Sequence, residues 1–213
     1  QHRSQLAKLV TRVEKPGIKH RRLMAIARAF RMKRVLERML DESEFLSPYG
    51  VRAVSRVYLD QPYVFDCNGF RSEVKYLAAE SDSDMFGGNS NWRGPVWMPV
   101  NYLIIESLCK FGSFYGDGFR VECPKGSRSM LSLGEVAEEL RNRLTRIFLR
   151  DAHGRRPVYN GYEKLQTDPH FKDYIWFHEY FDGDDGRGLG ASHQTGWTGL
   201  IANLIDELYS TNR

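Results

Sequence analysis

The sequence has few cysteines and no long hydrophobic run. No stretch approaches the roughly 20 apolar residues that a membrane-spanning helix needs, and the first residues, Gln1 to Ser4, show neither an initiator methionine nor a signal peptide. The three cysteines, Cys67, Cys109 and Cys123, form no Cys-x-x-Cys pair, which argues against a disulfide framework and against a zinc site. These absences predict a protein of a reducing compartment, the cytoplasm, with no membrane partner.

The sequence also lacks a strong excess of charge of one sign. Its 31 Lys and Arg residues against 27 Asp and Glu residues give a formal net charge of +4, which is too mild to indicate a nucleic-acid partner. The densest basic stretch, Lys15 to Arg38, is interpreted as the solvated face of a helix; an anionic partner or a neighbouring domain is the alternative. With 213 residues, of which 41% are hydrophobic, the chain is long enough for one large domain and is not a disordered protein. Because residue 1 is not methionine, we expect the chain to be part of a larger protein.

Apolar residues recur at helical spacing in four places along the chain. The pattern predicts a helix from about His20 to Asp41, a second beginning near Pro95, a third behind a capping box at Ser132 to Glu135, and a last one around Leu200 to Leu208. A turn is predicted at residues 45–50, and short strands are predicted at 120–122 and 157–159. The two long segments 51–94 and 151–190 are predicted to be mostly aperiodic loops. The predicted fold class is mainly α, with helices that support long functional loops.

The loop from Met85 to Trp97 combines Trp92, Arg93 and Trp97 with asparagine, serine and glycine. Carbohydrate sites use such a mixture, because aromatic faces stack on the apolar face of a sugar while amide and guanidinium groups bond its hydroxyls. The alternative is an ordinary loop whose tryptophans fill the core. Composition alone leaves both interpretations open.

A second dense loop, residues 174–186, places Glu179 within a run of aromatic side chains. A carboxylate in apolar surroundings either finds a partner or changes its proton affinity, so Glu179 is an acid/base candidate. The alternative is a structural glutamate that pairs with an arginine or caps a backbone. Further along, Gln194 and Trp197 lead into the last helix, where they are placed to face a ligand.

Three aspartates in the same loop, Asp182, Asp184 and Asp185, raise the question of calcium. An EF-hand counted from Asp182 needs glycine and glutamate where Arg187 and His193 stand, so it is excluded. An irregular calcium site stays open beside the simpler interpretation of a polar turn. The chain has no Gly-x-Ser-x-Gly motif and no recognisable cysteine nucleophile, and apart from this calcium ion no metal or cofactor is predicted.

Taken together, these loops resemble the signature segments of glycoside hydrolase family 63, which includes processing α-glucosidases and their bacterial relatives. The similar segments are, in the family's order, Phe45–Gly50, Gly87–Trp97 continued by Pro99–Tyr102, and Glu179–Thr198. The resemblance covers the chain from about residue 20 to its end. It implies an (α/α)6 toroid that hydrolyses an α-glycosidic bond, more specifically an α-glucosidic one, with inversion. It also implies that residues 1–213 are a single domain, the C-terminal portion of a larger catalytic domain.

The resemblance implies roles for individual residues as well. Glu179 matches the position of the family's catalytic base. The residues expected to bind an α-glucoside or related oligosaccharide are Trp92, Arg93, Trp97, Asn101, Gln194 and Trp197. The family's general acid, an aspartate well upstream of the base, has no counterpart here, since Asp66 and Asp84 lie in the wrong context.

We therefore expect a chain that carries the base without the acid. A toroid that lacks some of its helices also leaves apolar helix faces exposed, and we expect self-association through those faces. The alternative function is that of a non-catalytic helical module that binds carbohydrate or a protein.

Overall fold

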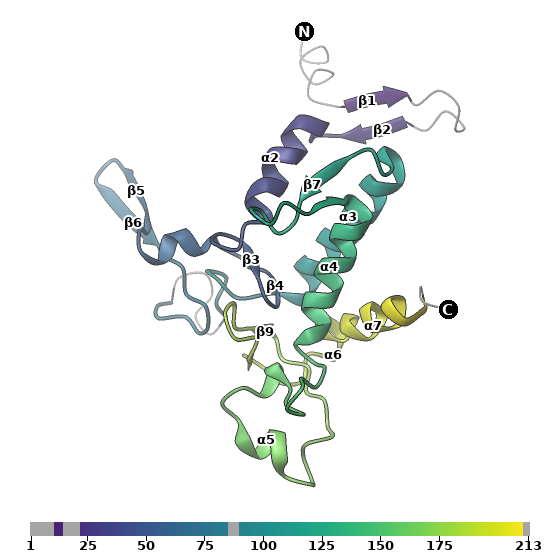
Figure 1. Ribbon diagram of the computed structural model, residues 1–213. Coiled ribbons are helices and arrows are strands. Elements are labelled where there is room, and N and C mark those ends of the chain that lie inside the picture. The colour runs from purple at the N-terminus through teal and green to yellow at the C-terminus, as the bar shows by residue number, and fades with distance from the viewer. Residues whose placement is uncertain (1–10, 15–21, 85–89, 211–213) are drawn as a thin grey trace.

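The computed structural model describes residues 11–14, 22–84 and 90–210. The helices are α2 (Ala29–Met39), α3 (Met98–Tyr115), α4 (Leu133–Arg146), α5 (Glu163–Thr167), α6 (Thr195–Thr198) and α7 (Leu200–Ser210), with 3-10 turns η1 (Arg56–Leu59) and η2 (Pro157–Tyr159). The strands are β1 (Thr11–Glu14), β2 (Arg22–Ala25), β3 (Leu46–Ser47), β4 (Gly50–Val51), β5 (Tyr63–Cys67), β6 (Phe70–Val74), β7 (Arg120–Glu122), β8 (Met130–Ser132), β9 (Tyr180–Phe181) and β10 (Gly188–Leu189). Figure 1 shows these elements arranged around α3 and α4.

The core forms where α3 and α4 pack along each other and α7 packs against both (Figure 1). The start of α4 is confirmed as predicted. Ser132 Oγ accepts a bond from the Glu135 N–H (3.3 Å), and the Glu135 carboxylate accepts one from the Ser132 N–H (2.6 Å). This reciprocal pair satisfies two backbone donors of the first turn. The apolar stripe of α4 has an exposed fraction of 1% or less; it consists of Leu133, Val136, Ala137, Leu140 and Leu144.

The first helix is shorter than its sequence pattern predicts. α2 begins at Ala29 instead of about His20, because β2 pairs with β1 in an antiparallel ladder before the helix starts. The helical spacing of apolar residues would place Ile26 on the buried face of the predicted helix. Ile26 is instead 79% exposed, and Met32 and Leu36 provide the buried face. The basic residues of α2 are exposed, as predicted for a solvated face; they are Arg31, Lys33, Arg34 and Arg38. The earlier part of the basic stretch, residues 15–21, lies outside the described residues.

The second helix differs from its prediction at both ends. α3 begins at Met98 and has Pro99 in its first turn, where the prediction placed Pro95. It continues through the expected glycine-rich break as far as Tyr115. The apolar spacing predicts that Val100 and Leu103 lie on the buried face of this helix. They are instead 44% and 65% exposed, so the face that α3 buries is rotated from the predicted one. The buried residues of α3 are Met98, Asn101, Ile105, Leu108 and Phe114.

Small antiparallel sheets make the fold mixed, which corrects the prediction of a mainly α protein. The described residues contain five sheets, each of two strands. The predicted strand at 120–122 is confirmed as β7, whereas 157–159 forms the 3-10 turn η2. The predicted turn at 45–50 is the tight β3–β4 hairpin. Helices still carry most of the core, which is compatible with a helical toroid.

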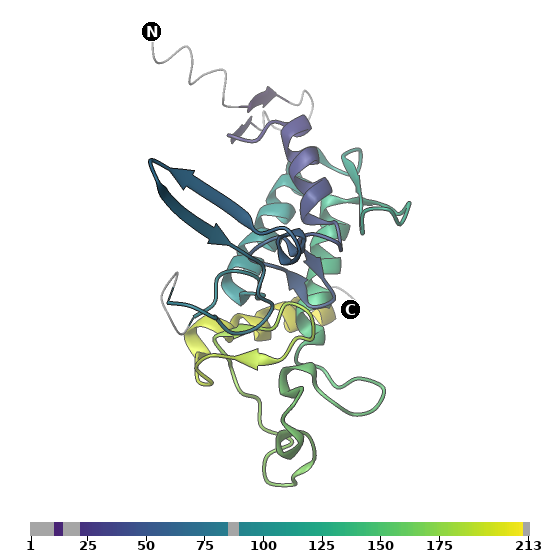
Figure 2. The same ribbon diagram turned by 90° about the vertical axis from the view of Figure 1, so that its left-hand side faces the viewer.

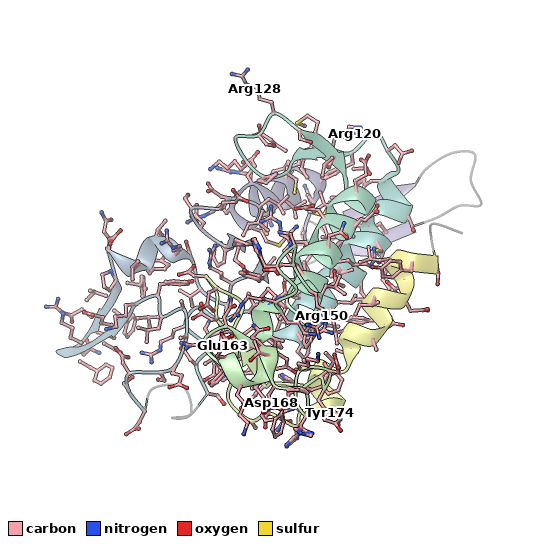
Figure 3. The ribbon with its side chains drawn as sticks, turned by 60° about the horizontal axis from the view of Figure 1, so that its bottom comes forward. Arg120, Arg128, Arg150, Glu163, Asp168 and Tyr174 are labelled. Atoms are coloured by element: carbon pink, nitrogen blue, oxygen red, sulfur yellow. The ribbon has the colours of Figure 1, made fainter. Side chains whose placement is uncertain are left out.

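Two peripheral parts extend from this core. The β5–β6 hairpin, in a region predicted to be irregular, projects as a long two-stranded arm (Figure 2). A second lobe surrounds α5; Figure 3 shows Glu163, Asp168 and Tyr174 grouped on it, while Arg128 points outward from the turn between β7 and β8. Within the described ranges, no helix is long and apolar enough to cross a membrane.

Candidate functional site

Backbone pairing at Val96 joins the three signature segments. The Val96 N–H donates to the Phe181 carbonyl (2.8 Å), and the Phe181 N–H donates back to Val96 (3.0 Å). On its other side Val96 bridges Arg52, which follows the β3–β4 hairpin, and the Ala53 N–H donates to the Pro95 carbonyl (3.0 Å). Val96 is fully buried. Segments near positions 50, 95 and 180 therefore meet in one short ladder that positions the candidate site.

Four aromatic rings form a cluster beside this ladder. Trp92 lies parallel to Trp97 with ring centroids 3.7 Å apart and planes 5° from parallel. Trp97 also stacks on Tyr180 (4.9 Å, 26°) and meets the edge of Trp197 (6.2 Å, 88°). The exposed fraction is 39% for Trp92 and 2% for Trp97. Trp97 therefore fills the core, as the alternative interpretation expects, while Trp92 is partly exposed and its contact with a sugar stays a prediction.

Glu179 precedes β9 and is half-buried next to this cluster. Its N–H donates to the Leu189 carbonyl (3.2 Å), and its own carbonyl accepts a bond from Trp197 Nε1 (3.0 Å). Its carboxylate accepts a 2.6 Å bond at Oε1 from the Ser90 hydroxyl and a longer one, 3.4 Å, at Oε2 from the Ala191 N–H. Among the described residues Glu179 forms no ion pair, so the predicted alternative of an arginine partner is not found there.

Arg93 is 4% exposed and directed at neighbouring protein groups. Its Nη2 lies 3.2 Å from Asp82 Oδ1 and donates to Ser81 Oγ (2.5 Å). Its buried Nε has no hydrogen-bond partner among the described residues. Arg93 therefore joins the segment around Asp82 to the tryptophan loop, and its Nε makes no hydrogen bond within the described residues.

Asn101 holds backbone together in this structure. Its Nδ2 donates to the carbonyls of Val51 and Trp97 (3.0 Å each), and its Oδ1 accepts a bond from the Val51 N–H (2.7 Å). The side chain is 1% exposed. Its predicted part in substrate binding stays a prediction, and the contacts seen tie α3 to the β3–β4 hairpin.

Two further residues shape the site, and composition assigned no role to either. Asn91 is fully buried; its Nδ2 donates to the carbonyls of Leu77 (2.8 Å) and Ala79 (2.6 Å), and its Oδ1 accepts from the Arg93 N–H (2.9 Å). Its carbonyl accepts from Trp97 Nε1 (3.1 Å). The other is Ser90, the donor to Glu179. The preceding residues of this loop, 85–89, lie outside the described residues.

Gln194 and Trp197 lie at α6. The Gln194 N–H donates to the Phe177 carbonyl (2.8 Å), which docks the start of α6 onto the segment before Glu179. The Gln194 side chain is exposed and makes no capping bond to the helix. Trp197 is half-buried, between Trp97 and the Glu179 carbonyl. Gln194 is thus placed at the surface, and Trp197 is part of the aromatic cluster.

His178, next to Glu179, is 6% exposed, and neither ring nitrogen has a hydrogen-bond partner within the described residues. Burial, together with the nearby His193, lowers the pKa of His178. The Thr198 hydroxyl donates to the His178 carbonyl (2.5 Å). A neutral buried imidazole therefore lies under the segment that carries Glu179.

The aspartate turn bonds mainly to the protein itself. Asp184 Oδ1 accepts from Arg52 Nη2 (3.1 Å) and from the Tyr76 hydroxyl (3.0 Å). Asp182 Oδ1 accepts from the N–H groups of Asp184 (2.7 Å) and Asp185 (3.1 Å), and burial raises the pKa of Asp182. No cluster of three or more His, Cys, Asp or Glu side chains suited to a metal occurs within the described ranges. The contacts fit the interpretation of a polar turn.

The principal cavity has a volume of about 720 Å³ and opens between α2, η1 and α3. Trp92, Trp97 and Asn101 contribute to its largely apolar lining, and Glu179 does not. The candidate base therefore lies outside this cavity, whereas the exposed Trp92 borders it.

Comparisons with known proteins show which family the chain resembles. Residues 23–198 match the family of mannosylglycerate hydrolase MGH1-like glycoside hydrolase domains. The uncharacterized protein YMR196W of Saccharomyces cerevisiae is 49% identical over 201 residues, covering 93% of this chain and 18% of that protein. A probable mannosyl-oligosaccharide glucosidase of Schizosaccharomyces pombe is 27% identical over 180 residues, covering 84% of this chain and 16% of that protein.

A plant protein is also similar to the chain. Alpha-glucosidase 2 of Arabidopsis thaliana is 30% identical over 118 residues, which cover 55% of this chain and 11% of that protein. The chain spans less than a fifth of the length of these three relatives. Since the family match extends over most of the chain and includes both dense loops, the chain belongs to the MGH1-like glycoside hydrolases, the family 63 type that its motifs indicate.

Proposed function

We propose that this chain contributes the catalytic base, Glu179, to an inverting α-glycosidase that acts on an α-glucoside or a related oligosaccharide. The observation that carries the proposal is the carboxylate of Glu179, half-buried beside the cluster of four aromatic rings and free of any ion pair within the described residues. Family membership and relatives named as glucosidases support it.

In the proposed reaction Glu179 takes a proton from a water molecule as that water attacks the anomeric carbon. The bond from that carbon to the leaving oxygen breaks, and a carboxylic acid on the opposite side of the sugar protonates the leaving oxygen. Inversion needs about 6.5–9.5 Å between the two carboxyl groups so that the water fits. The step needs no group beyond the two carboxyls and water.

Substrate binding is proposed for the exposed aromatic and polar groups of the site. Trp92 presents a half-exposed ring, stacked on the rigid Trp97, to the apolar face of a sugar. Gln194 offers an exposed amide to hydroxyl groups. Arg93, Trp97 and Trp197 support these contacts, and the Nε of Arg93 has no hydrogen-bond partner among the described residues.

The general acid is proposed to come from another part of the family's domain, since no aspartate of this chain lies in the matching context. In that longer protein, residues 1–213 form the C-terminal portion of an (α/α)6 toroid. Three free thiols, Cys67, Cys109 and Cys123, support a cytoplasmic location.

The decisive experiment compares the full-length protein that contains this chain with its Glu179→Gln variant on an aryl α-glucoside. We expect turnover to fall by more than about 100-fold, because the base can no longer accept a proton, while thermal unfolding is unchanged. Proton NMR of the first product is expected to show the β anomer. Glu163→Gln, which changes an exposed glutamate on α5, is the matched control. Near-normal turnover of Glu179→Gln, or an α anomer formed first, contradicts the proposal.

A second candidate function is a non-catalytic module that binds carbohydrate or protein. The cavity of about 720 Å³, which Trp92 borders and Glu179 does not, is the observation in its favour. Calorimetric titration of α-glucosides into the full-length protein distinguishes the two. Binding without any hydrolysis, unchanged in Glu179→Gln, supports the module.

Self-association of the chain on its own is also proposed. Phe30 and Val35 on α2 are 56% and 62% exposed, and Leu103 on α3 is 65% exposed. Exposed apolar side chains on neighbouring helices favour association. Light scattering over a range of concentrations is expected to show a mass above 24.7 kDa, and a constant monomer mass contradicts this.

A further inference from the structure

A short hydrogen bond joins the side chain of Ser90, in one dense loop, to the carboxylate of Glu179, in the other. The Ser90 hydroxyl donates to Glu179 Oε1 at 2.6 Å, across 89 positions of sequence. Hydrogen bonds from a hydroxyl to an ionised carboxylate fall in this short range and are stronger than neutral ones. The contact therefore restrains the position of the carboxylate, whose long side chain otherwise has several rotamers.

The donor itself is held in place by the next residue. Asn91 is fully buried and bonds the carbonyls of Leu77 and Ala79 through its Nδ2, and its own carbonyl accepts from Trp97 Nε1. These bonds fix the backbone that presents Ser90. The hydroxyl thus projects from an anchored segment.

Glu179, the acceptor of this bond, is held in place by its own backbone contacts. The Glu179 backbone is tied to Leu189 through its N–H (3.2 Å) and to Trp197 through its carbonyl (3.0 Å). On the far side of the carboxylate lies Gly190, where a Cβ would stand 2.7 Å from Glu179 Oε2. Only glycine leaves room for the carboxylate in this orientation. Ser90 on one oxygen and Gly190 beside the other define a single placement.

We propose that Ser90 is a positioning residue for Glu179; this inference rests on the proposed function. By bonding Oε1, Ser90 fixes the direction of the carboxylate. A carboxylate has about four acceptor sites, so capacity remains for the attacking water.

The test compares Ser90→Ala, Ser90→Thr and the control Ser107→Ala in the full-length protein, with Glu179→Gln alongside. Ser107 is exposed on α3, and its hydroxyl bonds only the helix carbonyl of Leu103 (2.7 Å), so this control makes the same chemical change away from the site. We expect Ser90→Ala to lower kcat by about 10- to 100-fold with KM nearly unchanged. Ser90→Thr, which keeps the hydroxyl, is expected to recover most of the activity.

The outcomes separate this inference from the proposed function. If Glu179→Gln is inactive while Ser90→Ala matches the wild type, the positioning role is wrong and the base assignment stands. A rise in KM with unchanged kcat also overturns it, since Ser90 would then be a substrate contact. If Ser90→Thr is as impaired as Ser90→Ala, the effect is structural and the inference fails. If the wild type shows no hydrolysis, or Glu179→Gln retains it, the proposed function fails and takes this inference with it.

Discussion

Trp92 lies flat on Trp97, with ring centroids 3.7 Å apart and planes 5° from parallel, yet only one of the two rings is covered. The exposed fraction is 39% for Trp92 and 2% for Trp97. Trp97 further contacts Tyr180 and Trp197. The pair therefore divides into a rigid inner ring that supports the core and an outer ring that presents its free face to solvent.

The first prediction follows from this division. Trp92→Ala is expected to weaken glucoside binding by about tenfold, because a stacking surface is lost, with little change in stability. Trp97→Ala is expected to lower the free energy of unfolding by about 3–5 kcal/mol, because it removes a buried aromatic side chain. Calorimetric titration and denaturant unfolding of both variants check this. Equal losses of stability in the two would contradict the division.

The parts of the fold that the sequence predicts correctly are those that short local patterns determine. The capping box joins Ser132 to Glu135, three positions further on, so neighbouring residues alone determine its geometry. The β5–β6 hairpin was missed although a signal was present. Its turn is Asn68–Gly69, with φ angles of 52° and 83°, and Asn-Gly between two extended runs is a strong hairpin pattern. The exposure of both strands weakened the hydrophobic alternation that would have marked them.

The arrangement of the site depends on contacts that no local pattern encodes. Ser90 reaches Glu179 across 89 positions, and Val51 meets Asn101 across 50. The resemblance to a family selected Glu179 and the tryptophans, and the structure brings them together. It directs Asn101 toward the backbone, a role that residue type does not reveal. The catalytic role of Glu179 stays a prediction.

Asn101 provides the second prediction. Asn101→Ala leaves the N–H and carbonyl of Val51 and the carbonyl of Trp97 without their partner. We expect a loss of about 2–4 kcal/mol in the free energy of unfolding, since buried polar groups are left unsatisfied. Asn142→Ala, at an exposed position of α4, is the control and is expected to stay within about 0.5 kcal/mol. If Asn101→Ala unfolds like the wild type but binds glucosides poorly, Asn101 is a ligand residue after all.

The third prediction concerns pH and His178. Burial, with His193 nearby, lowers the pKa of His178 in the folded state below the ordinary 6.5. Above that value both states are neutral, so the stability is fully present. As the pH falls below 6.5, the unfolded state takes up the proton first, and stability is lost until the pH reaches the folded-state pKa.

Unfolding free energies measured between neutral pH and about pH 5 test this sign. His178→Gln, which does not titrate, is expected to flatten the decline. His170→Gln, which changes a residue at an exposed position of the α5 lobe, is expected to keep the wild-type slope. A decline that persists in full in His178→Gln would assign the dependence to other groups.

The last prediction separates backbone strain from a clash at the candidate base. Gly190 has φ +68°, and a Cβ there would stand 2.7 Å from Glu179 Oε2 and 2.8 Å from Tyr180. Gly154 has a similar φ of +75° but nothing within 4 Å of an added Cβ. Alanine at either position bears the same cost of a left-handed backbone, about 1–2 kcal/mol, so the difference in stability between the two variants reports the clash.

We expect Gly190→Ala to lose more stability than Gly154→Ala and to lose turnover as well, because the carboxylate is displaced from its bond with Ser90. Gly154→Ala is expected to keep full turnover in the same assay. Equal turnover in the two variants would mean that the carboxylate tolerates displacement, and that its placement between Ser90 and Gly190 is not required for activity.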